Sequence, residues 1–393
     1  MSLTRRRLFR GMLGTPPQDH AWISARGREA MMAGHVEAQM GAAAATMIRI
    51  SSNENPLGPG QHVLDAIVGK FPEASRYPFN ATQTESALIG ALAQKFGARP
   101  PHVVLGPGSG EILTHAVRAF TSPTKPLVTA WPSFEAPRDT AKKIGSGVRE
   151  VGFDSTLRID LAKLVEASKG AGLVFFCNPN NPTSTVHGKT AVADTVKAIR
   201  AASPDTVILI DEAYHDYVTD PSYQTAVGLA LSTPNVFVTR TFSKAYGMAG
   251  LRAGYGIGDE AVIKAVTRFK TPYALSTLTL GGAIAALANQ PHIDAERQRN
   301  TQVKAFTVKA LADLGVAGAD SQANFLFMDI KRPAAAFRDA CRAAGVLVGR
   351  DFPPFEKTHC RISIGTMDEM QRAVAVFKTA VSGATSTSRQ AGR

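Results

Sequence analysis

The most reactive feature of this sequence is a lysine in a turn of small and hydroxyl-bearing residues. Lys244 lies in Thr239-Arg-Thr-Phe-Ser-Lys-Ala-Tyr-Gly-Met-Ala-Gly-Leu-Arg252, and Arg252 follows it by eight residues. A lysine amine forms a Schiff base with an aldehyde, while the hydroxyls of Thr241 and Ser243 and the guanidinium of Arg252 suit a phosphate. Taken alone, such a segment more often holds a solvated surface lysine. Three further segments favour the reactive lysine.

A glycine-rich turn gives a second candidate anion site. The segment Val103-Val-Leu-Gly-Pro-Gly-Ser-Gly-Glu-Ile-Leu113 predicts a strand, a turn and the start of a helix. Free backbone N–H groups at a helix start bind anions, and glycines allow close approach. We therefore expect Gly108, Ser109 and Gly110 to join the phosphate site, although an ordinary strand-to-helix turn has the same pattern.

Polar clusters follow three apolar runs that are typical of strands buried on both faces. The run Leu173–Cys177 leads into Asn178-Pro-Asn-Asn-Pro-Thr183, and the run Val207–Ile210 leads into Asp211-Glu-Ala-Tyr214. The third run, Val236–Thr239, leads into the lysine turn. Strands that alternate with helices predict an α/β fold with a mostly parallel sheet. Ligands bind beyond the carboxyl ends of such strands.

These clusters fit pyridoxal 5'-phosphate as a cofactor. Its ring nitrogen needs a carboxylate, for which Asp211 is the candidate, so that the ring acts as an electron sink. Tyr214 and Asn181 could reach the phenolic oxygen, and Phe134 could stack on the ring. Each residue also has an ordinary structural explanation: Asp211 as a helix N-cap, Asn181 as a turn residue, and the two aromatic residues as core. Their joint occurrence at strand ends favours the cofactor site.

The motifs together resemble the signature segments of the fold-type I, class I/II pyridoxal-phosphate-dependent aminotransferases, within them the histidinol-phosphate aminotransferase branch. The resemblance covers residues 48–380 and is highly specific as a set. The segments that carry it are Asn178–Thr183, Asp211–Tyr214, Ser243–Arg252, Ser52-Asn-Glu-Asn-Pro-Leu-Gly58, Arg76-Tyr-Pro78 and Cys360-Arg-Ile-Ser-Ile-Gly-Thr366.

The resemblance implies further roles for this chain. It implies a homodimer in which Tyr77 reaches the cofactor phosphate of the partner subunit. It implies that Arg361 binds a substrate anion, either an α-carboxylate or a phosphate, and that Arg350 is a second arginine for a substrate phosphate. Asn324 is expected in the substrate site as well. The implied fold is a mostly parallel large-domain sheet flanked by helices, with a smaller α+β C-terminal domain.

Two departures from the family pattern bear on the turn chemistry and the substrate. Ser184 stands where the family usually has glycine. The loop Asp351–Cys360 is shorter and more apolar than the histidinol-phosphate pattern, with Phe352 and Phe355 in it. If this loop folds over the site, an apolar or aromatic α-amino acid is favoured over histidinol phosphate. The alternative is a phosphate clamp made by two arginines.

The domain organisation follows from the composition along the chain. We expect a disordered arm or degenerate twin-arginine signal, then a large cofactor-binding domain, then a small domain and a disordered tail. The expected bounds are 1–46, 47–295, 296–381 and 382–393, with residues 47–75 open to packing against the small domain. We also expect a long helical region over 261–288 and a helix over 301–314.

Composition argues against several classes of function. The chain has 393 residues, a formal net charge of +12 and three cysteines. No apolar run reaches about 18 residues, the length of a membrane span, and no Lys/Arg block indicates nucleic-acid binding. An odd cysteine count without C-x-x-C pairs indicates neither a disulfide framework nor a metal site. The arm contains Arg5-Arg6-Arg7, which resembles the start of a twin-arginine signal, but two prolines and polar residues break the apolar region that should follow. We therefore expect a cytoplasmic protein, with twin-arginine export to the periplasm as the alternative.

The function expected is transfer of an amino group between an amino acid, or histidinol phosphate, and a 2-oxo acid through a Schiff base on Lys244. Another pyridoxal-phosphate reaction on the same fold, decarboxylation or elimination, is the main alternative. A non-enzymatic regulator is a third. Arg361 favours transamination, because it would hold the carboxylate that a decarboxylase must expel. The partners expected are a small-molecule amino donor and a 2-oxo acid acceptor, without nucleic acid or membrane.

Overall fold

The computed structural model describes residues 47–80 and 84–382. Contacts divide the chain into Met1–Met47 and Ile48–Arg393, and every described helix and strand belongs to the second unit. The twin-arginine segment lies outside the described residues, as does the tail from residue 383. Their assignment therefore stays a prediction.

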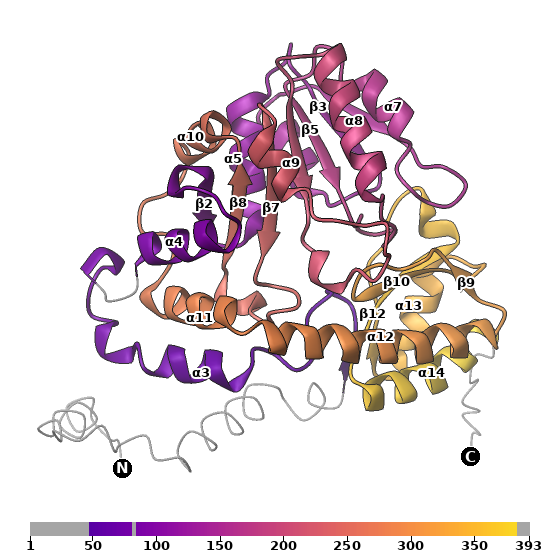
Figure 1. The fold of residues 1–393 in the computed structure, drawn as a ribbon. Coiled ribbons are helices and arrows are strands. Elements are labelled where there is room, and N and C mark those ends of the chain that lie inside the picture. Colours follow the sequence, from indigo (N-terminus) through magenta and orange to yellow (C-terminus); the bar gives the residue numbers. More distant parts are fainter. Residues whose placement is uncertain (1–46, 81–83, 383–393) are drawn as a thin grey trace, which may run out of the picture. The chain divides into compact units, whose positions relative to one another are not determined.

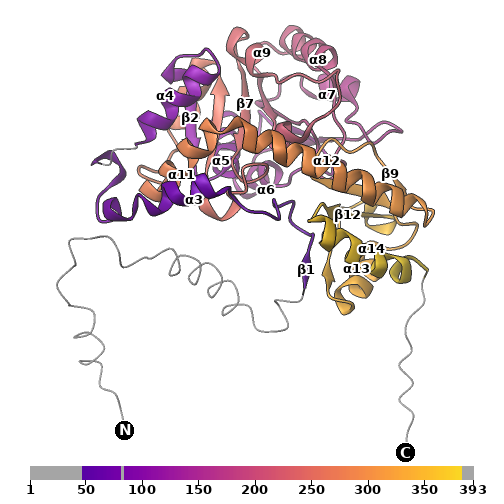
Figure 2. The ribbon, with the colours of Figure 1, turned by 60° about the horizontal axis from the view of Figure 1, so that its bottom comes forward.

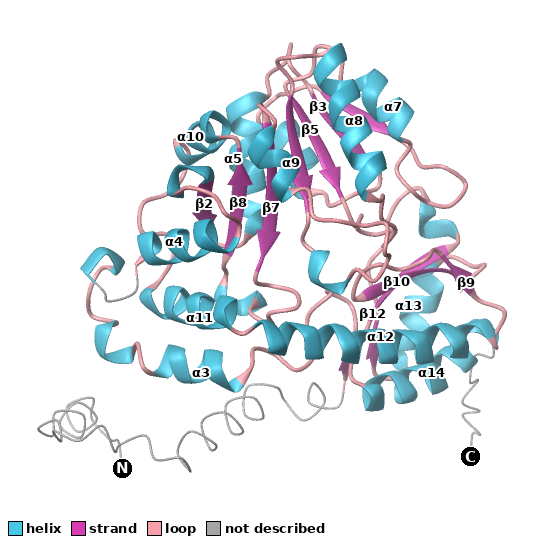
Figure 3. Cartoon of the chain, viewed as in Figure 1, coloured by secondary structure: helices cyan, strands magenta, loops and turns pink. Residues whose placement is uncertain are grey.

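A seven-stranded sheet forms the centre of the large domain (Figures 1 and 3). Six strands are parallel to one another, and β8 runs antiparallel to both of its neighbours, β2 and β7. The fold is therefore α/β with a mostly parallel sheet. In sheet order the strands are β2 (Val103–Gly106), β8 (Gly254–Gly258), β7 (Val236–Thr241), β6 (Val207–Asp211), β5 (Leu173–Cys177), β3 (Leu127–Ala130) and β4 (Val148–Val151).

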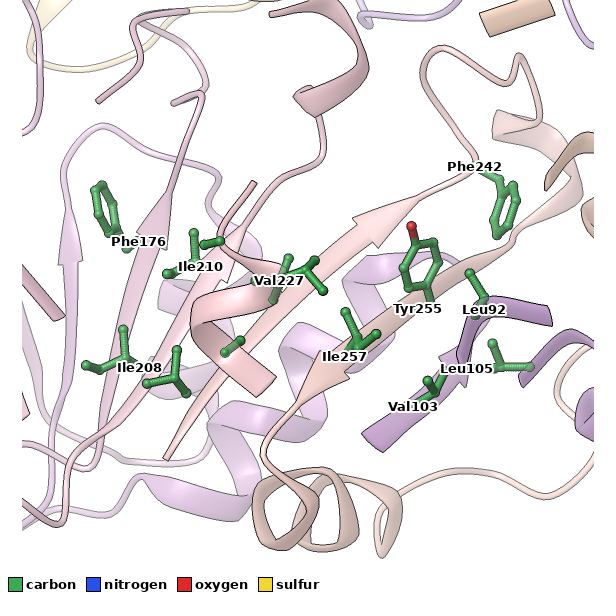
Figure 4. Packing of buried hydrophobic residues seen from close by; sticks show 14 of the residues in the cluster. Leu92, Val103, Leu105, Phe176, Ile208, Ile210, Val227, Phe242, Tyr255 and Ile257 are labelled. Carbon is green, nitrogen blue, oxygen red and sulfur yellow. The ribbon is translucent and has the colours of Figure 1, made fainter. Parts of the chain in front are cut away.

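Helices cover both faces of this sheet. On the face shown in Figure 4, Phe176, Ile208 and Ile210 pack in one apolar cluster with Val227 of α9 and Leu92 of α4. The alternate residues of β5 and β6 enter a second cluster on the other face. This two-sided burial explains the continuous apolar runs of the central strands. The helices are α3 (Gln61–Val68), α4 (Glu85–Lys95), α5 (Ser109–Phe120), α6 (Ala136–Lys143), α7 (Leu161–Ala167), α8 (Lys189–Ala202), α9 (Val227–Ser232), α10 (Glu260–Thr267) and α11 (Thr277–Ala288).

The small domain has its own apolar core and two small sheets. In one sheet β10 lies between β12 and β9, and in the other β1 pairs in parallel with β11. Ile48 and Ile50 are buried in this core. Figure 2 shows β1 beside the small-domain helices. The elements are β1 (Ile48–Arg49), α12 (Gln290–Ala312), β9 (Ala317–Gly318), β10 (Phe325–Asp329), α13 (Ala334–Ala343), β11 (Val346–Leu347), β12 (His359–Ser363) and α14 (Met367–Ser382).

Two expected helices differ from the structure. The region 261–288 is two helices, α10 and α11, and the segment between them contains Pro272 and Tyr273, whose φ is +57°. Neither residue continues an α-helix in that setting. The helix expected over 301–314 is α12, which begins at Gln290 and extends from the large domain to the small one (Figure 1). The expected domain boundary at 295/296 therefore falls inside a continuous helix.

Candidate active site

A cavity of about 650 Å³ lies at the carboxyl ends of β5, β6 and β7, where residues of the small domain also line it. Twelve residues predicted for the site line this cavity. They are Ser109, Gly110, Phe134, Asn181, Asp211, Tyr214, Thr241, Ser243, Lys244, Arg252, Arg350 and Arg361. Gly108, Tyr77 and Asn324 do not line it.

Lys244 follows β7 and is partly buried in the cavity. Its Nζ donates a 3.4 Å hydrogen bond to the backbone oxygen of Ser52 and lies 5.6 Å from the ring centroid of Tyr214. Burial and the nearby guanidiniums of Arg361 and Arg252 lower the pKa of the amine to about 8. At pH 7 about one lysine in ten is then neutral, compared with fewer than one in a thousand at an ordinary pKa. This amine is prepared to act as a nucleophile.

Asp211 is the last residue of β6 and is buried. Its Oδ1 accepts a 2.8 Å hydrogen bond from Oγ1 of Thr239, and its Oδ2 lies 3.9 Å from Sγ of Cys177. Burial raises the pKa of this carboxyl to about 7, although the hydrogen bond from Thr239 lowers it. A cation placed against this carboxyl would stabilise its charged form.

The neighbouring carboxylate points to the other side of the strand. Glu212 is buried and pairs with Arg240, whose Nε and Nη2 lie 3.0 and 2.8 Å from Oε2. Thr225 also donates to this carboxylate. Because side chains alternate along a strand, only the first of the two consecutive acids faces the cavity. Glu212 instead ties β6 to β7.

Tyr214 and Asn181 lie on the same side of the cavity as Arg361. The Tyr214 hydroxyl accepts a 3.0 Å hydrogen bond from Nδ2 of Asn53. Burial raises the pKa of this hydroxyl above its usual value, so it keeps its proton at neutral pH. Oδ1 of Asn181 accepts a 2.8 Å hydrogen bond from Nη1 of Arg361, which fixes the orientation of the Asn181 amide.

The amino end of α5 also lines the cavity, at Ser109 and Gly110. Gly108 precedes the helix with a φ of +78°, and no side chain caps the helix start. A Cβ at this position would clash with Nη2 of Arg252. Oγ1 of Thr241 and Oγ of Ser243 are 2.9 Å apart, and Nη1 of Arg252 lies 3.5 Å from Ser243. Uncapped backbone N–H groups, two hydroxyls and a guanidinium form a fitting cradle for a phosphate.

Arg361 has no carboxylate partner in the part of the chain that the structure describes. This side chain is 7% exposed and donates to Asn181 and, from Nη2 at 2.6 Å, to the backbone oxygen of Ser51. Its Nε is buried without a hydrogen-bond partner among the described residues. Arg350, in contrast, forms a 2.6 Å ion pair with Glu135.

Two expectations about the substrate side need correction. Phe352 does not line the cavity, because its ring lies against the guanidiniums of Arg350 and Arg361, with centroid distances of 4.2 and 4.9 Å. Phe355 packs against other aromatic rings outside the cavity. The apolar lining comes instead from residues such as Leu347, the last residue of β11, and Val348, which follows it.

Asn324 holds the chain behind the cavity. Its Nδ2 donates to the backbone oxygens of Asn53 and Glu54 at 3.2 and 3.3 Å. The segment 51–54 in turn lines the cavity.

The sequence alone indicated no role for Asn53 or Glu135. The segment Ser52–Gly58 was recognisable as a family motif, but its placement depends on contacts with residues more than 100 positions away.

Tyr77 lies outside the cavity on an exposed aromatic cluster. It is 66% exposed, and its ring lies 5.9 Å from that of Phe79 and 5.8 Å from that of Tyr273.

Within residues 47–80 and 84–382, no helix is both long and apolar enough to cross a membrane. The same residues contain no group of three or more metal-ligating side chains suited to a metal ion.

Comparison with known proteins identifies the family. The model of the aminotransferase class I and II family matches residues 45–377. Histidinol-phosphate aminotransferase of Symbiobacterium thermophilum is 34% identical over 337 residues, covering 85% of this chain and 91% of the relative. The aromatic amino acid aminotransferase of Thermobifida fusca is 36% identical over 339 residues, covering 84% and 89%.

A solved structure bears on the cofactor. Histidinol-phosphate aminotransferase from Sinorhizobium meliloti, in complex with pyridoxal-5'-phosphate, superposes with a TM-score of 0.79 at 26% identity, covering 95% of this chain and all of that one. The phosphate cradle, the buried carboxyl of Asp211 and the amine of Lys244 fit the same cofactor. The chain thus belongs to the class I and II aminotransferases and is a transaminase that works with pyridoxal 5'-phosphate.

Proposed function

We propose that the amino donor is an α-amino acid with an apolar or aromatic side chain, and that a 2-oxo acid accepts the amino group. Arg361 supports the α-amino acid part of this proposal, and the apolar cavity lining at Leu347 and Val348 supports the side-chain part. Arg361 is a buried guanidinium with no carboxylate partner among the described residues. A buried charge without a counter-ion is costly, and a planar guanidinium suits a carboxylate. We assign Arg361 to the donor's α-carboxylate.

Lys244, Asp211 and Tyr214 are the proposed catalytic residues. When bound, pyridoxal phosphate supplies an aldehyde that combines with amines and a ring that accepts an electron pair. Asp211 would hold the proton on the ring nitrogen of the cofactor, and the hydroxyl of Tyr214 and the amide of Asn181 would face its phenolic oxygen. The phosphate would lie at Ser109, Gly110, Thr241, Ser243 and Arg252, while Phe134 would cover one face of the ring.

The Lys244 amine is the proposed proton carrier. Its pKa of about 8 allows both protonation states near neutral pH. A group with balanced states can remove a proton from Cα of the donor and later return one, as general base and then general acid. Because Arg361 would retain the α-carboxylate on the substrate, this arrangement supports proton transfer at Cα over loss of carbon dioxide.

Histidinol phosphate is the second candidate donor. Arg350 and Arg361 lie against the same ring of Phe352, and two guanidiniums at one place could clamp a phosphate. The ion pair favours the first candidate, because a phosphate must displace Glu135 before it can bind Arg350. Arg361 then keeps a positive charge with only neutral acceptors among the described residues, which suits one α-carboxylate.

A comparison of kcat/KM values tests this choice, since that ratio measures discrimination between substrates. Phenylalanine, tyrosine, leucine and histidinol phosphate would be compared with 2-oxoglutarate and with pyruvate as acceptors. We expect the amino acids to be preferred. A preference for histidinol phosphate of more than about tenfold, a difference of about 1.4 kcal/mol, would contradict the proposal. Arg361→Ala should weaken either donor, and Arg350→Ala only the phosphorylated one.

We also propose a homodimer. The exposed rings of Tyr77, Phe79 and Tyr273 form a contiguous aromatic cluster. Exposed aromatic surface of this kind is typical of protein interfaces. In the proposed dimer, Tyr77 reaches the cofactor phosphate of the partner subunit.

A further inference from the structure

The arginines that line the cavity differ in whether a carboxylate neutralises them. Of the arginines on the substrate side, Arg338 forms an ion pair with Asp351, and Arg350 forms one with Glu135. Arg361 has only neutral acceptors among the described residues. Glu135 is thus a carboxylate of the cavity lining that pairs with Arg350 of the same lining.

Only one of the two carboxylate oxygens of Glu135 has a partner among the described residues. Glu135 follows Phe134 directly and precedes α6 of the large domain, whereas Arg350 follows β11 of the small domain. Its Oε1 meets Nη2 of Arg350 at 2.6 Å. Its Oε2 is buried without a hydrogen-bond partner among the described residues. A buried oxygen without a partner makes this position unfavourable for a carboxylate, so the pair is easily exchanged.

Arg350 is free to change partner without moving far. Its side chain is 49% exposed, and ion pairs with that exposure contribute little to stability. Its guanidinium lies 4.2 Å from the ring centroid of Phe352, and Nη1 donates to the backbone oxygen of Asp351 at 3.0 Å. These contacts keep the guanidinium at the cavity whether or not Glu135 is its counter-ion.

A transaminase must accept two different substrates in turn at one site. We propose that Glu135 is a specificity-determining residue, the exchangeable counter-ion of Arg350. With the pair closed, the side-chain end of the cavity is neutral and takes apolar groups. A substrate with a second carboxylate, or with a phosphate, displaces Glu135 and binds Arg350 in its place. The inference rests on the proposed function, because it takes Arg361 as the holder of the first anion.

The test compares Glu135→Gln with the wild-type holoenzyme. We expect the kcat/KM for glutamate, relative to that for phenylalanine, to rise by about tenfold in Glu135→Gln, because the competing carboxylate is removed. The gain should be absent when Glu135→Gln is combined with Arg350→Ala, so that the double variant has the same kcat/KM ratio as Arg350→Ala alone. The matched control is Glu150→Gln, which removes the carboxylate paired with Arg138 of α6 outside the cavity and should leave the ratio unchanged.

Equilibrium binding gives a second readout that does not depend on turnover. Calorimetry would measure the dissociation constants of glutarate and of 3-phenylpropionate, which carry two carboxylates and one. Glu135→Gln should tighten glutarate by about tenfold and change 3-phenylpropionate by less than about twofold. If the ratio of the dissociation constants of glutarate and 3-phenylpropionate is the same in Glu135→Gln as in the wild type, the proposed role of Glu135 is wrong. Failure of the proposed function would appear separately, as 3-phenylpropionate binding that does not respond to Arg361→Ala.

Discussion

Thr239 donates a 2.8 Å hydrogen bond from Oγ1 to Oδ1 of Asp211, its direct partner across the parallel strands β7 and β6. Both side chains are buried. The bond occupies one carboxylate oxygen and leaves Oδ2 near Cys177 at the cavity. The register of two strands therefore sets the orientation of the carboxylate, and the hydrogen bond partly offsets the cost of burying its charge.

The first prediction concerns Asp211→Asn. We expect the variant to fold and to lose about 10²–10³-fold in turnover, the usual effect of removing one preorganised electrostatic group. An amide cannot hold the ring nitrogen of the cofactor protonated. Steady-state kinetics would be measured beside Asp205→Asn, an exposed carboxylate outside the cavity. Near-wild-type turnover of Asp211→Asn would remove Asp211 from this role.

The second prediction concerns the pH dependence of the cofactor-free protein. The pKa of Asp211 is raised from 3.8 to about 7 in the folded state, so the folded state holds a proton that the unfolded chain has lost. The stability contributed by this difference falls as pH rises from about 4 to about 7. Asp211→Asn should raise the free energy of unfolding of the apo-protein more at pH 8 than at pH 5, by on the order of a few kcal/mol in denaturant unfolding. Equal effects at both pH values would contradict this.

The third prediction concerns the lysine that binds the cofactor. Borohydride reduction of the holoenzyme should attach the cofactor to Lys244, and Lys244→Ala should abolish turnover. Lys304 is an internal control, because burial also lowers its pKa to about 8, yet it lies in α12 away from the cavity. Peptide mapping that finds the label on Lys304, or on any other lysine, shows the assignment to be wrong.

The fourth prediction concerns assembly. Sedimentation should find a homodimer that loses cofactor on dissociation. Tyr77→Phe keeps the exposed ring and removes the hydroxyl, so we expect an intact dimer. Cofactor binding should weaken by about 10- to 150-fold, since a hydrogen bond to a charged group is worth about 1.5–3 kcal/mol. Tyr273→Phe is the matched control in the same cluster. A fully active monomer would refute the dimer, and unchanged cofactor affinity in Tyr77→Phe would refute the role of its hydroxyl.

The fifth prediction concerns Ser184, where the family usually has glycine. Its φ of +60° lies in the left-handed region, which costs a residue with a Cβ about 1–2 kcal/mol. Glycine removes this backbone cost, but part of the gain is lost because glycine has more conformational entropy in the unfolded chain. Ser184→Gly should therefore stabilise the protein by about 0.5–1 kcal/mol in denaturant unfolding. Ala198→Gly, in the interior of α8, should destabilise it by a similar amount. A destabilised Ser184→Gly variant would show that its hydroxyl outweighs the backbone cost.

The central strands could be predicted because burial on both faces gives a continuous apolar run, as in β5 and β6. Strand β8 could not, because its sequence is Gly254-Tyr-Gly-Ile-Gly258. A Cβ at Gly254 would clash with the backbone of Ser109, and one at Gly258 with the backbone of Phe237. The glycines are required by tertiary contacts, which mask the strand pattern.

The residues of the candidate site divide in the same way. Asp211 ends β6, and Asn181 and Lys244 lie within four residues after β5 and β7, so their place at one edge of the sheet could be predicted from the chain order. Asn53 and Glu135 could not be found, since each acquires its partner only when the two domains meet: Asn53 contacts Tyr214, and Glu135 contacts Arg350.

The pairing of β1 with β11 has a consequence for how the chain matures on the ribosome. Residues 48 and 49 leave the ribosome about 300 residues before their partners, Val346 and Leu347. At about 5–20 residues per second, this interval is roughly 15–60 s. Throughout that time the nascent chain carries Ile48 and Ile50 without the core that later buries them. The small domain can therefore complete its folding only near the end of translation, after the central strands of the large domain have been synthesised.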